Sequence, residues 1–141
     1  MAKMFLKNTP LQIEYEYDFA IEGGTAGLIN LGDATRNPGD LPFGFCVTGC
    51  VISVTTAVVG STSTVSAGPT DDPNGWIAAT AEANMVIMDV VGSAGSIATD
   101  QQVCNDAASA DVTITIGTAD LTAGKFKMTV FGFIPTDAVG Q

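Results

Sequence analysis

The chain has 141 residues, a length typical of one domain with a substantial hydrophobic core. Hydrophobic residues make up 46% of it and charged residues only 14%, well below the charge of most soluble chains, so much of the surface has to be Ser, Thr and Ala or be covered by a neighbour. The net charge of −10 disfavours nucleic acid as a partner, and no apolar run approaches the roughly 18 residues of a membrane-spanning helix, so we also expect no membrane partner.

Residues 1–10 are expected to form an N-terminal arm, followed by a single β-sandwich domain over residues 11–141. The arm lacks an apolar stretch long enough for a secretory signal. It does contain three consecutive apolar residues, Met4, Phe5 and Leu6, beside Lys3 and Lys7. Apolar side chains on an arm have to pack against their own domain or against a partner.

A strict alternation over Leu11–Ile21 predicts the first strand. Leu11, Tyr15 and Tyr17 belong to an aliphatic and aromatic face, and Glu14 and Glu16 belong to an acidic face. This pattern is typical of a long antiparallel strand with one dry side and one wet side. The paired glutamates are interpreted as solvated surface charge.

Three further strands are expected before the middle of the chain. Residues 28–31 predict a short strand, and residues 33–40 a loop. Residues 45–59 are small and mostly apolar on both faces, as in a central strand, with Gly49 marking a bulge or a close approach. Residues 62–67 give another β-branched strand.

The segment from Trp76 to Ala83 is the one helix candidate, since its Ala-rich sequence favours a helix of about two turns. Asp72 would cap this helix. Asp71, Asp72 and Asn74 also form an oxygen-rich loop of a kind that calcium favours. The spacing misses the EF-hand pattern, so a capping and turn role is favoured and no metal or cofactor is expected. Trp76 is interpreted as a core anchor rather than a ligand-stacking residue.

The most regular pattern is the closing stretch, residues 111–135. It predicts two strands joined as a β-hairpin, with the turn at residues 122–124. Phe131 and Phe133 fall on the strand face that Lys125 and Lys127 occupy earlier. A strand that is apolar on both sides is covered on both sides, within the fold or by another chain. The whole pattern predicts an all-β fold: an antiparallel β-sandwich of about eight strands with one short helix.

An enzyme is not expected, because the chain has no histidine and no motif places a base beside a nucleophile. The chain has three cysteines, an odd number. Cys46 and Cys50, four apart on one strand, are expected to share a face about 13 Å apart, too far for a mutual disulfide. Either could meet Cys104, and buried reduced thiols are the favoured interpretation.

Four segments together resemble the small head proteins of tailed bacteriophages, the jelly-roll decoration (cement) proteins and related virion structural proteins. They are LPFGFCVTGCVISVTTA, STVSAG, WIAATAEA and DVTITIGTADLTAGKFKMTVFGFIP, within residues 41–135. The resemblance implies a jelly roll, symmetric oligomers and attachment to the major capsid protein on the outer surface of the virion, after synthesis in the host cytoplasm. The first strand and the arm lie outside it.

Two function classes follow. The first is a capsid decoration protein that stabilises the head, and the alternative is a receptor- or glycan-binding head-fiber or knob module. Aromatic residues are few, 7%, which favours the structural role. The chain is expected to form a homo-oligomer, with a trimer favoured, and its lysines could steer that edge toward an acidic partner. The expected interface residues are Met4, Phe5, Leu6, Lys125, Lys127, Phe131 and Phe133.

Overall fold

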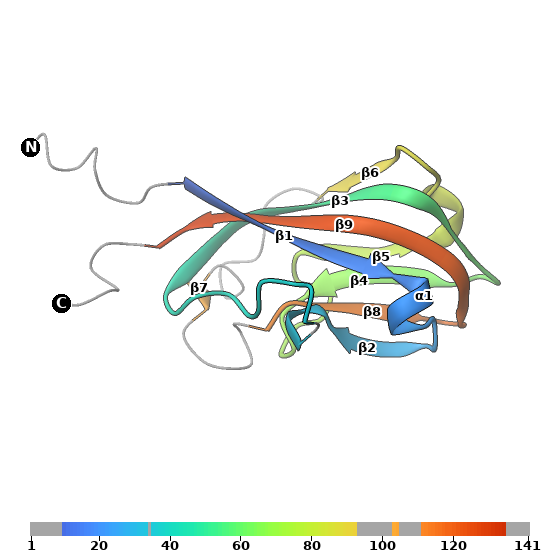
Figure 1. Cartoon of the computed structure of the whole chain (residues 1–141), viewed down its shortest axis with the longest axis horizontal. Coiled ribbons are helices and arrows are strands. Elements are labelled where there is room, and N and C mark those ends of the chain that lie inside the picture. The colour runs from blue at the N-terminus through green and yellow to red at the C-terminus, as the bar shows by residue number, and fades with distance from the viewer. Residues whose placement is uncertain (1–9, 34, 93–102, 105–110, 135–141) are drawn as a thin grey trace, which may run out of the picture.

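Two antiparallel sheets face each other in this computed structural model, which describes residues 10–33, 35–92, 103–104 and 111–134 (Figure 1). Sheet 1 has the order β1-β9-β3-β6, and β7 pairs with the start of β3. Its strands are β1 (Pro10–Asp18), β9 (Leu121–Phe133), β3 (Phe45–Gly60), β6 (Val90–Gly92) and β7 (Val103–Cys104). Sheet 2 has the order β2-β8-β4-β5. Its strands are β2 (Gly27–Asn30), β8 (Thr113–Gly117), β4 (Thr64–Gly68) and β5 (Ile77–Ala81).

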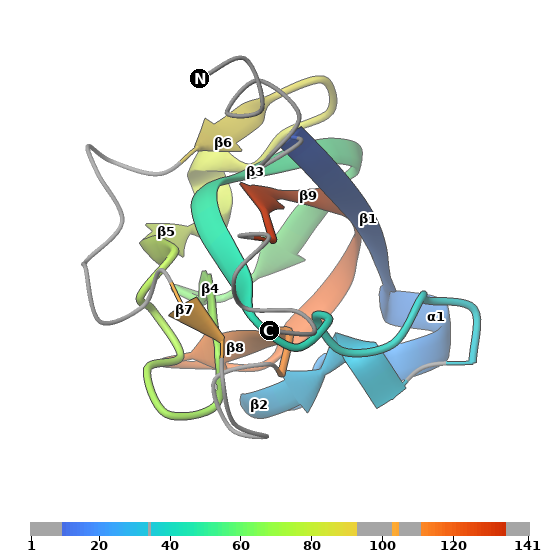
Figure 2. The same ribbon diagram turned by 90° about the vertical axis from the view of Figure 1, so that its left-hand side faces the viewer.

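The order of the strands is that of a jelly roll. Apart from the β4–β5 connection, and leaving β7 aside, each strand passes to the other sheet before the next one begins. Figure 2 shows the two sheets enclosing the space between them. The predicted all-β sandwich with one short helix is therefore confirmed, and the strand order gives it the double Greek-key connectivity of jelly rolls.

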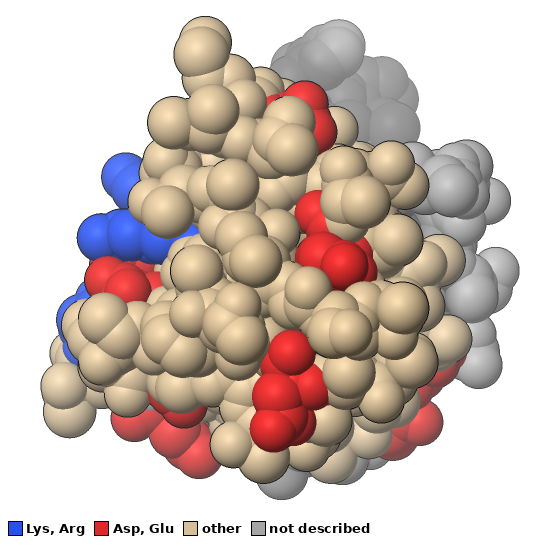
Figure 3. Space-filling model, turned by 90° about the vertical axis from the view of Figure 1, so that its right-hand side faces the viewer, with Lys and Arg blue, Asp and Glu red and all other residues tan. Residues whose placement is uncertain are grey.

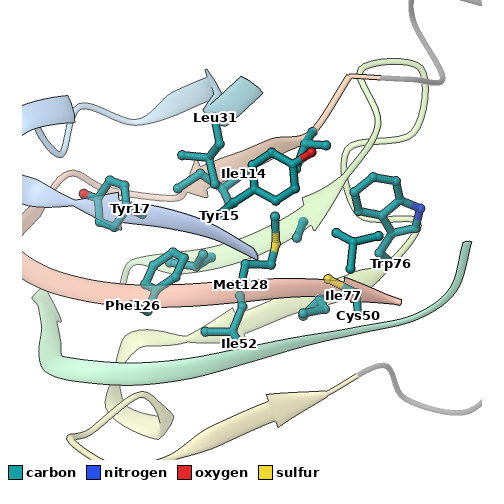
Figure 4. Close-up of a cluster of buried hydrophobic side chains, with 14 of the residues drawn as sticks. Tyr15, Tyr17, Leu31, Cys50, Ile52, Trp76, Ile77, Ile114, Phe126 and Met128 are labelled. Carbon is teal, nitrogen blue, oxygen red and sulfur yellow. The ribbon is translucent and has the colours of Figure 1, made fainter. Parts of the chain in front are cut away.

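Side chains from the inner faces of both sheets fill the core (Figure 4). Tyr15 and Tyr17 of β1 are fully buried, as their place on the apolar face predicts. Each hydroxyl group finds an acceptor, since Tyr15 donates to the Gly39 carbonyl at 2.7 Å and Tyr17 to the Gly23 carbonyl at 2.8 Å. The Tyr17 ring lies 4.9 Å from that of Phe126 on β9. Burying one such ring contributes roughly 1.5–3 kcal/mol.

The longest strands, β3 and β9, pair in the middle of sheet 1. A bulge between Val47 and Gly49 reverses which residues of β3 face inward. Before it Val47 is buried, and after it Cys50 is buried while Cys46 stays only half-buried. The expected bulge at Gly49 is confirmed. The expectation that the two cysteines share a face is wrong, because the extra residue turns them to opposite sides of the sheet.

The expected helix over Trp76–Ala83 is wrong. Residues Ile77–Ala81 form β5, which pairs with β4, and only a short 3₁₀ turn follows at Glu82–Asn84. Alanine prefers helix by less than 1 kcal/mol per residue, so strand pairing and the burial of Trp76 and Ile77 decide the conformation. Asp72 caps no helix, and its backbone carbonyl accepts from Gly75 N at 2.8 Å within a turn.

The short helix lies elsewhere, at α1 (Phe19–Glu22), within the range predicted as the end of the first strand. Asp18 ends β1 and caps α1, where its carboxylate accepts from Ala20 N at 2.9 Å. The Glu22 carboxylate accepts from Asp18 N at 2.7 Å. Two side-chain acceptors for backbone N–H groups thus turn the chain before the predicted strand is complete.

The predicted hairpin over residues 111–135 is also corrected. β8 pairs with β2 and β4 in sheet 2, whereas β9 pairs with β1 and β3 in sheet 1. The turn precedes Leu121, so the expected turn residues 122–124 belong to β9. Strands that face each other across a core show the same alternation as hairpin partners, since alternation reports burial and not the neighbouring strand.

Gly132 permits a close approach of β3 and β9. A methyl group there would overlap the carbonyl oxygen of Cys46 and lie 2.5 Å from Cε1 of Phe45. We expect Gly132→Ala to lower the free energy of unfolding by about 1–3 kcal/mol, measured by chemical denaturation. Gly92→Ala is the matched control on β6, because its nearest contact would be 4.0 Å from Val51. Equal losses in both variants would contradict the packing argument.

Candidate interaction surface

The outer face of sheet 1 carries rows of opposite charge on neighbouring strands. The acidic face of β1 lies beside β9, with Glu16 opposite Lys127 and Asp18 opposite Lys125 in the register. Lys125 Nζ lies 3.3 Å from Asp18 Oδ2 and 3.7 Å from Glu16 Oε1. Lys127 Nζ lies 3.3 Å from Glu14 Oε1. The acidic side of the first strand, predicted to be wet, is therefore paired with the lysines of the last.

Arg36 brings a third cation to the same face from the loop before β3. Its Nε lies 3.5 Å from Glu16 Oε1, it forms a second ion pair with Glu22, and its Nη2 donates to the Glu16 carbonyl at 2.9 Å. The neighbouring Asn37 amide donates to the same carbonyl at 3.1 Å and accepts from Glu16 N at 2.9 Å. All three cations in the described residues are thus in ion pairs. Each exposed pair stabilises the fold by no more than about 1 kcal/mol.

The pKa values of Asp18 and of Tyr17, which lies on the inner face of β1, reflect these neighbours. The Ala20 N–H that donates to the Asp18 carboxylate, with help from Lys125, holds the pKa of Asp18 below its ordinary value. Burial, followed by the negative charges of Glu22 and Asp18, raises the pKa of the Tyr17 hydroxyl to about 12. Tyr17 therefore stays neutral and keeps its hydrogen bond near neutral pH.

Phe131 and Phe133 lie on the same face, farther along β9, and both are half-buried. In the register Phe131 is opposite Gly49 of β3, and Phe133 is opposite Pro10, where β1 begins. The absence of a side chain at Gly49 leaves the Phe131 ring space on that side. The structure therefore brings Lys125, Lys127 and the two phenylalanines to one face. The arm residues Met4, Phe5 and Leu6 lie outside the described residues.

A second apolar surface, which the sequence pattern does not predict, lies in the segment that joins β5 to β6. Val86, Ile87 and Met88 are exposed there, together with Val90 at the start of β6. Four apolar residues stand close together in the sequence after the Ala-rich stretch, but nothing in their pattern distinguishes an exposed loop from a buried strand.

No metal site emerges in the part of the chain that the structure describes. It holds no group of three or more His, Cys, Asp or Glu residues placed to bind an ion. Residues 69–75, which contain the oxygen-rich loop, are closed by turn hydrogen bonds such as Asp72 N to the Pro69 carbonyl at 3.1 Å. None of the helices in the described ranges is long and apolar enough to cross a membrane.

The cysteines offer little nucleophilic chemistry. Cys46 and Cys50 are both reduced thiols. Burial raises the pKa of the Cys50 thiol to about 12 and that of the Cys46 thiol above its ordinary value. A thiolate is the reactive form, so both groups are poor nucleophiles at neutral pH. In the register Cys104 is opposite Phe45, the residue before Cys46.

The jelly roll recurs in known structures. It matches a chain of the cyanophage Pam1 capsid with a TM-score of 0.62 and 14% identity, over 92% of this chain and 87% of that one. The fold is one found in phage capsids. A chain from the acid-stable capsid of Helicobacter pylori bacteriophage KHP30 matches with a TM-score of 0.59 and 19% identity, over 92% and 91%. A chain from the capsid of Ralstonia phage GP4 matches with a TM-score of 0.58 and 16% identity, over 92% and 87%.

These likenesses concern the fold. No protein-family profile matches the chain, and no curated protein sequence matches it. Identities between 14% and 19% accompany a shared arrangement of strands over nearly the whole of each chain. The resemblance noted in the sequence covered only residues 41–135, whereas the structural matches cover 92% of the chain.

Asp40 supplies a pH-dependent contribution to stability. Burial raises the pKa of its carboxyl group above the ordinary 3.8, and the nearby charges of Asp111 and Asp33 raise it further. The carboxylate packs so closely on Gly32 that a side chain there would overlap it. The Asp111 carboxylate is itself bound by the Thr70 hydroxyl at 2.6 Å.

We therefore expect Asp40→Asn to raise the melting temperature at pH 7. In the wild type the folded state takes up this proton at a higher pH than the unfolded state, so stability rises as pH falls through the folded pKa. The gain is complete below the unfolded value near 3.8, where the two proteins should melt alike. Melting curves between pH 3 and 7 measure this. A difference that stays constant with pH would contradict it.

Proposed function

We propose that this chain is a virion structural protein, a decoration (cement) protein that binds the outer surface of a phage head and stabilises it. The observation that carries the proposal is a jelly roll shared, over most of both chains, with chains of three phage capsids. A shared fold alone does not define function, so the surface also has to suit a protein that binds others. Apolar side chains remain exposed at both ends of the sandwich, which supports such a role.

The surface chemistry fits a protein that works in an assembly. At one end of sheet 1, Phe131 and Phe133 are half-exposed on the outer face of β9. At the other end, Ile87 and Met88 are largely exposed. In a chain with only 14% charged residues, such groups are the surfaces that association would cover.

We further propose a homo-oligomer, with a trimer favoured, in contact with the major capsid protein. The last strand and the arm are the proposed contact between copies. Lys125 and Lys127 are already bound to acidic side chains of β1, so their role there is to hold β1 against β9 more than to attract a distant partner. Synthesis in the host cytoplasm is part of the same proposal.

Two alternatives receive less support. A glycan-binding module generally presents exposed aromatic rings, but the described part of the chain has one aromatic side chain that is more than half exposed, Phe43 at 66%. Enzymatic activity finds no support either, because Cys46 and Cys50 are poorly ionised and the chain has no histidine. We infer that the protein is not an enzyme.

The assembly proposal is tested by two variants, deletion of residues 1–7 and the double change Phe131→Ser with Phe133→Ser. We expect each variant to remain folded, because residues 1–7 precede the first strand in the sequence and Phe131 and Phe133 lie outside the buried core. Each variant should lose oligomer mass in light scattering. We also expect weaker binding to heads that lack this protein, measured by co-sedimentation.

Glu14→Ser is the control on the same face of sheet 1, since it removes an exposed ion pair with Lys127 without removing apolar surface or an expected interface residue. It should retain both the oligomer mass and the binding. If the wild-type protein fails to sediment with heads, the decoration function is wrong. If both test variants assemble and bind as the wild type does, the interface between copies lies elsewhere.

A further inference from the structure

The connection between β5 and β6 presents apolar side chains to solvent at one end of the sandwich. Ile87 is 62% exposed, Met88 85%, and Val86 48%, and Val90 follows at 66%. Figure 1 places this connection at the upper right, at the opposite end of the strands from the place where β1 begins and β9 ends. We call Val86, Ile87 and Met88 the apolar tip. Large apolar side chains exposed side by side are a recurring mark of protein interfaces.

The apolar tip is held in a defined position. Met85, just before it, is fully buried, and its carbonyl accepts from Val58 N of β3 at 2.9 Å. At the end of the tip, Met88 N donates to the Val54 carbonyl at 3.0 Å, and Val54 N donates to the carbonyl of Asp89, the next residue, at 2.9 Å. The tip is therefore fastened to β3 on both sides. A surface ordered before it binds loses less conformational entropy on binding.

Two hydrogen bonds join Asp89 to Val86, across the apolar tip. The Asp89 carboxylate accepts from Val86 N at 3.1 Å, while Asp89 N donates to the Val86 carbonyl at 2.9 Å. The backbone of Met88 has φ +71°, a left-handed conformation that residues other than glycine, asparagine and aspartate seldom adopt. The fold thus keeps a strained methionine pointing into solvent.

The charge around the tip is negative. Glu82 and Asp89 flank it in sequence, and Asp120 lies at the same end, where its carbonyl accepts from Ser63 while Ser63 in turn accepts from Glu82 N. Figure 3 shows acidic side chains across this end and basic side chains only at its left margin. The three cations of the described residues are bound to acidic groups on β1 and α1. This end of the molecule is therefore apolar with an acidic surround.

We propose that the apolar tip docks into an apolar pocket bordered by Lys or Arg side chains on a different protein. Charge complementarity selects that occupant, because a second copy of this end would bring acidic groups against acidic groups. The tip also lies at the opposite end from Phe131 and Phe133, which leaves those residues for contact between copies. The inference rests on the proposed function, under which the partner is the capsid shell.

The test compares two isoleucines of nearly equal exposure. Ile87→Ser removes a side chain of the tip, and Ile21→Ser removes one that is 65% exposed on α1. The probe is a head preparation that lacks this protein. We expect Ile87→Ser to weaken binding at least about tenfold, and Ile21→Ser to bind as the wild type does. Both variants should melt as the wild type does, since neither side chain is buried. Binding of the wild type should weaken as salt is added.

Met88→Gly provides a second variant that separates binding from folding. Glycine adopts φ +71° without strain, so this variant should be at least as stable as the wild type in thermal melting and yet bind heads more weakly. A merely structural role for Met88 predicts the stability change without the binding loss, and that result would overturn the proposal.

Three further results would contradict the inference in different ways. If the wild type binds heads and Ile87→Ser binds equally well, the tip is not the docking site, while the decoration function stands. If Ile87→Ser changes the oligomer mass, the occupant is a second copy of the chain. If the wild type does not bind heads at all, the proposed function fails and the shell as partner fails with it.

Discussion

The pairing of β3 with β9 is the constraint on which the rest of the structure depends. These are the longest strands, and they occupy the middle of sheet 1, where β1, β6 and β7 each pair with one of them. Their backbones approach closely at Gly132, and Gly124 lies against Val58 near the other end of the pair. Bulges in β3 adjust the register so that both strands keep apolar residues inward along their length. The two glycines and the bulges thus set the shape onto which the other strands of the sheet are added.

Electrostatics divides the surface into two regions. Along the outer face of β1 and β9, opposite charges lie across neighbouring strands, and Arg36 joins them from a loop. At the end that carries the apolar tip, the acidic residues have no such partners among the described cations. Among the described residues, most of the excess negative charge therefore lies away from the paired face. The first region joins β1 to β9, and the second is the region that the proposed basic partner would contact.

The sequence was sufficient for features that depend on local alternation and insufficient for those that depend on distant neighbours. Burial of Tyr15 and Tyr17, the central position of β3 and the bulge at Gly49 all followed from periodicity and residue type. The helix predicted from propensity at β5 was wrong, since pairing with β4 outweighs the helix preference of a few alanines. The predicted hairpin was wrong because β8 and β9 lie in opposite sheets and face the same core. The sequence pattern predicted the apolar outer face at the phenylalanines of β9. It did not predict the apolar tip, because the exposure of a loop depends on what packs around it.

The length of the β1–β9 ladder has a mechanical consequence. Pro10 is opposite Phe133 and Asp18 is opposite Lys125, so nine consecutive residue pairs join the two strands. A force applied between the start of β1 and the far end of the sandwich acts along the strands, whereas their hydrogen bonds run across them. Such a force loads the ladder in shear, and many bonds resist it at once instead of opening singly. A protein held by these two ends would resist stretching along its long axis far better than it would resist peeling of β1 from the sheet.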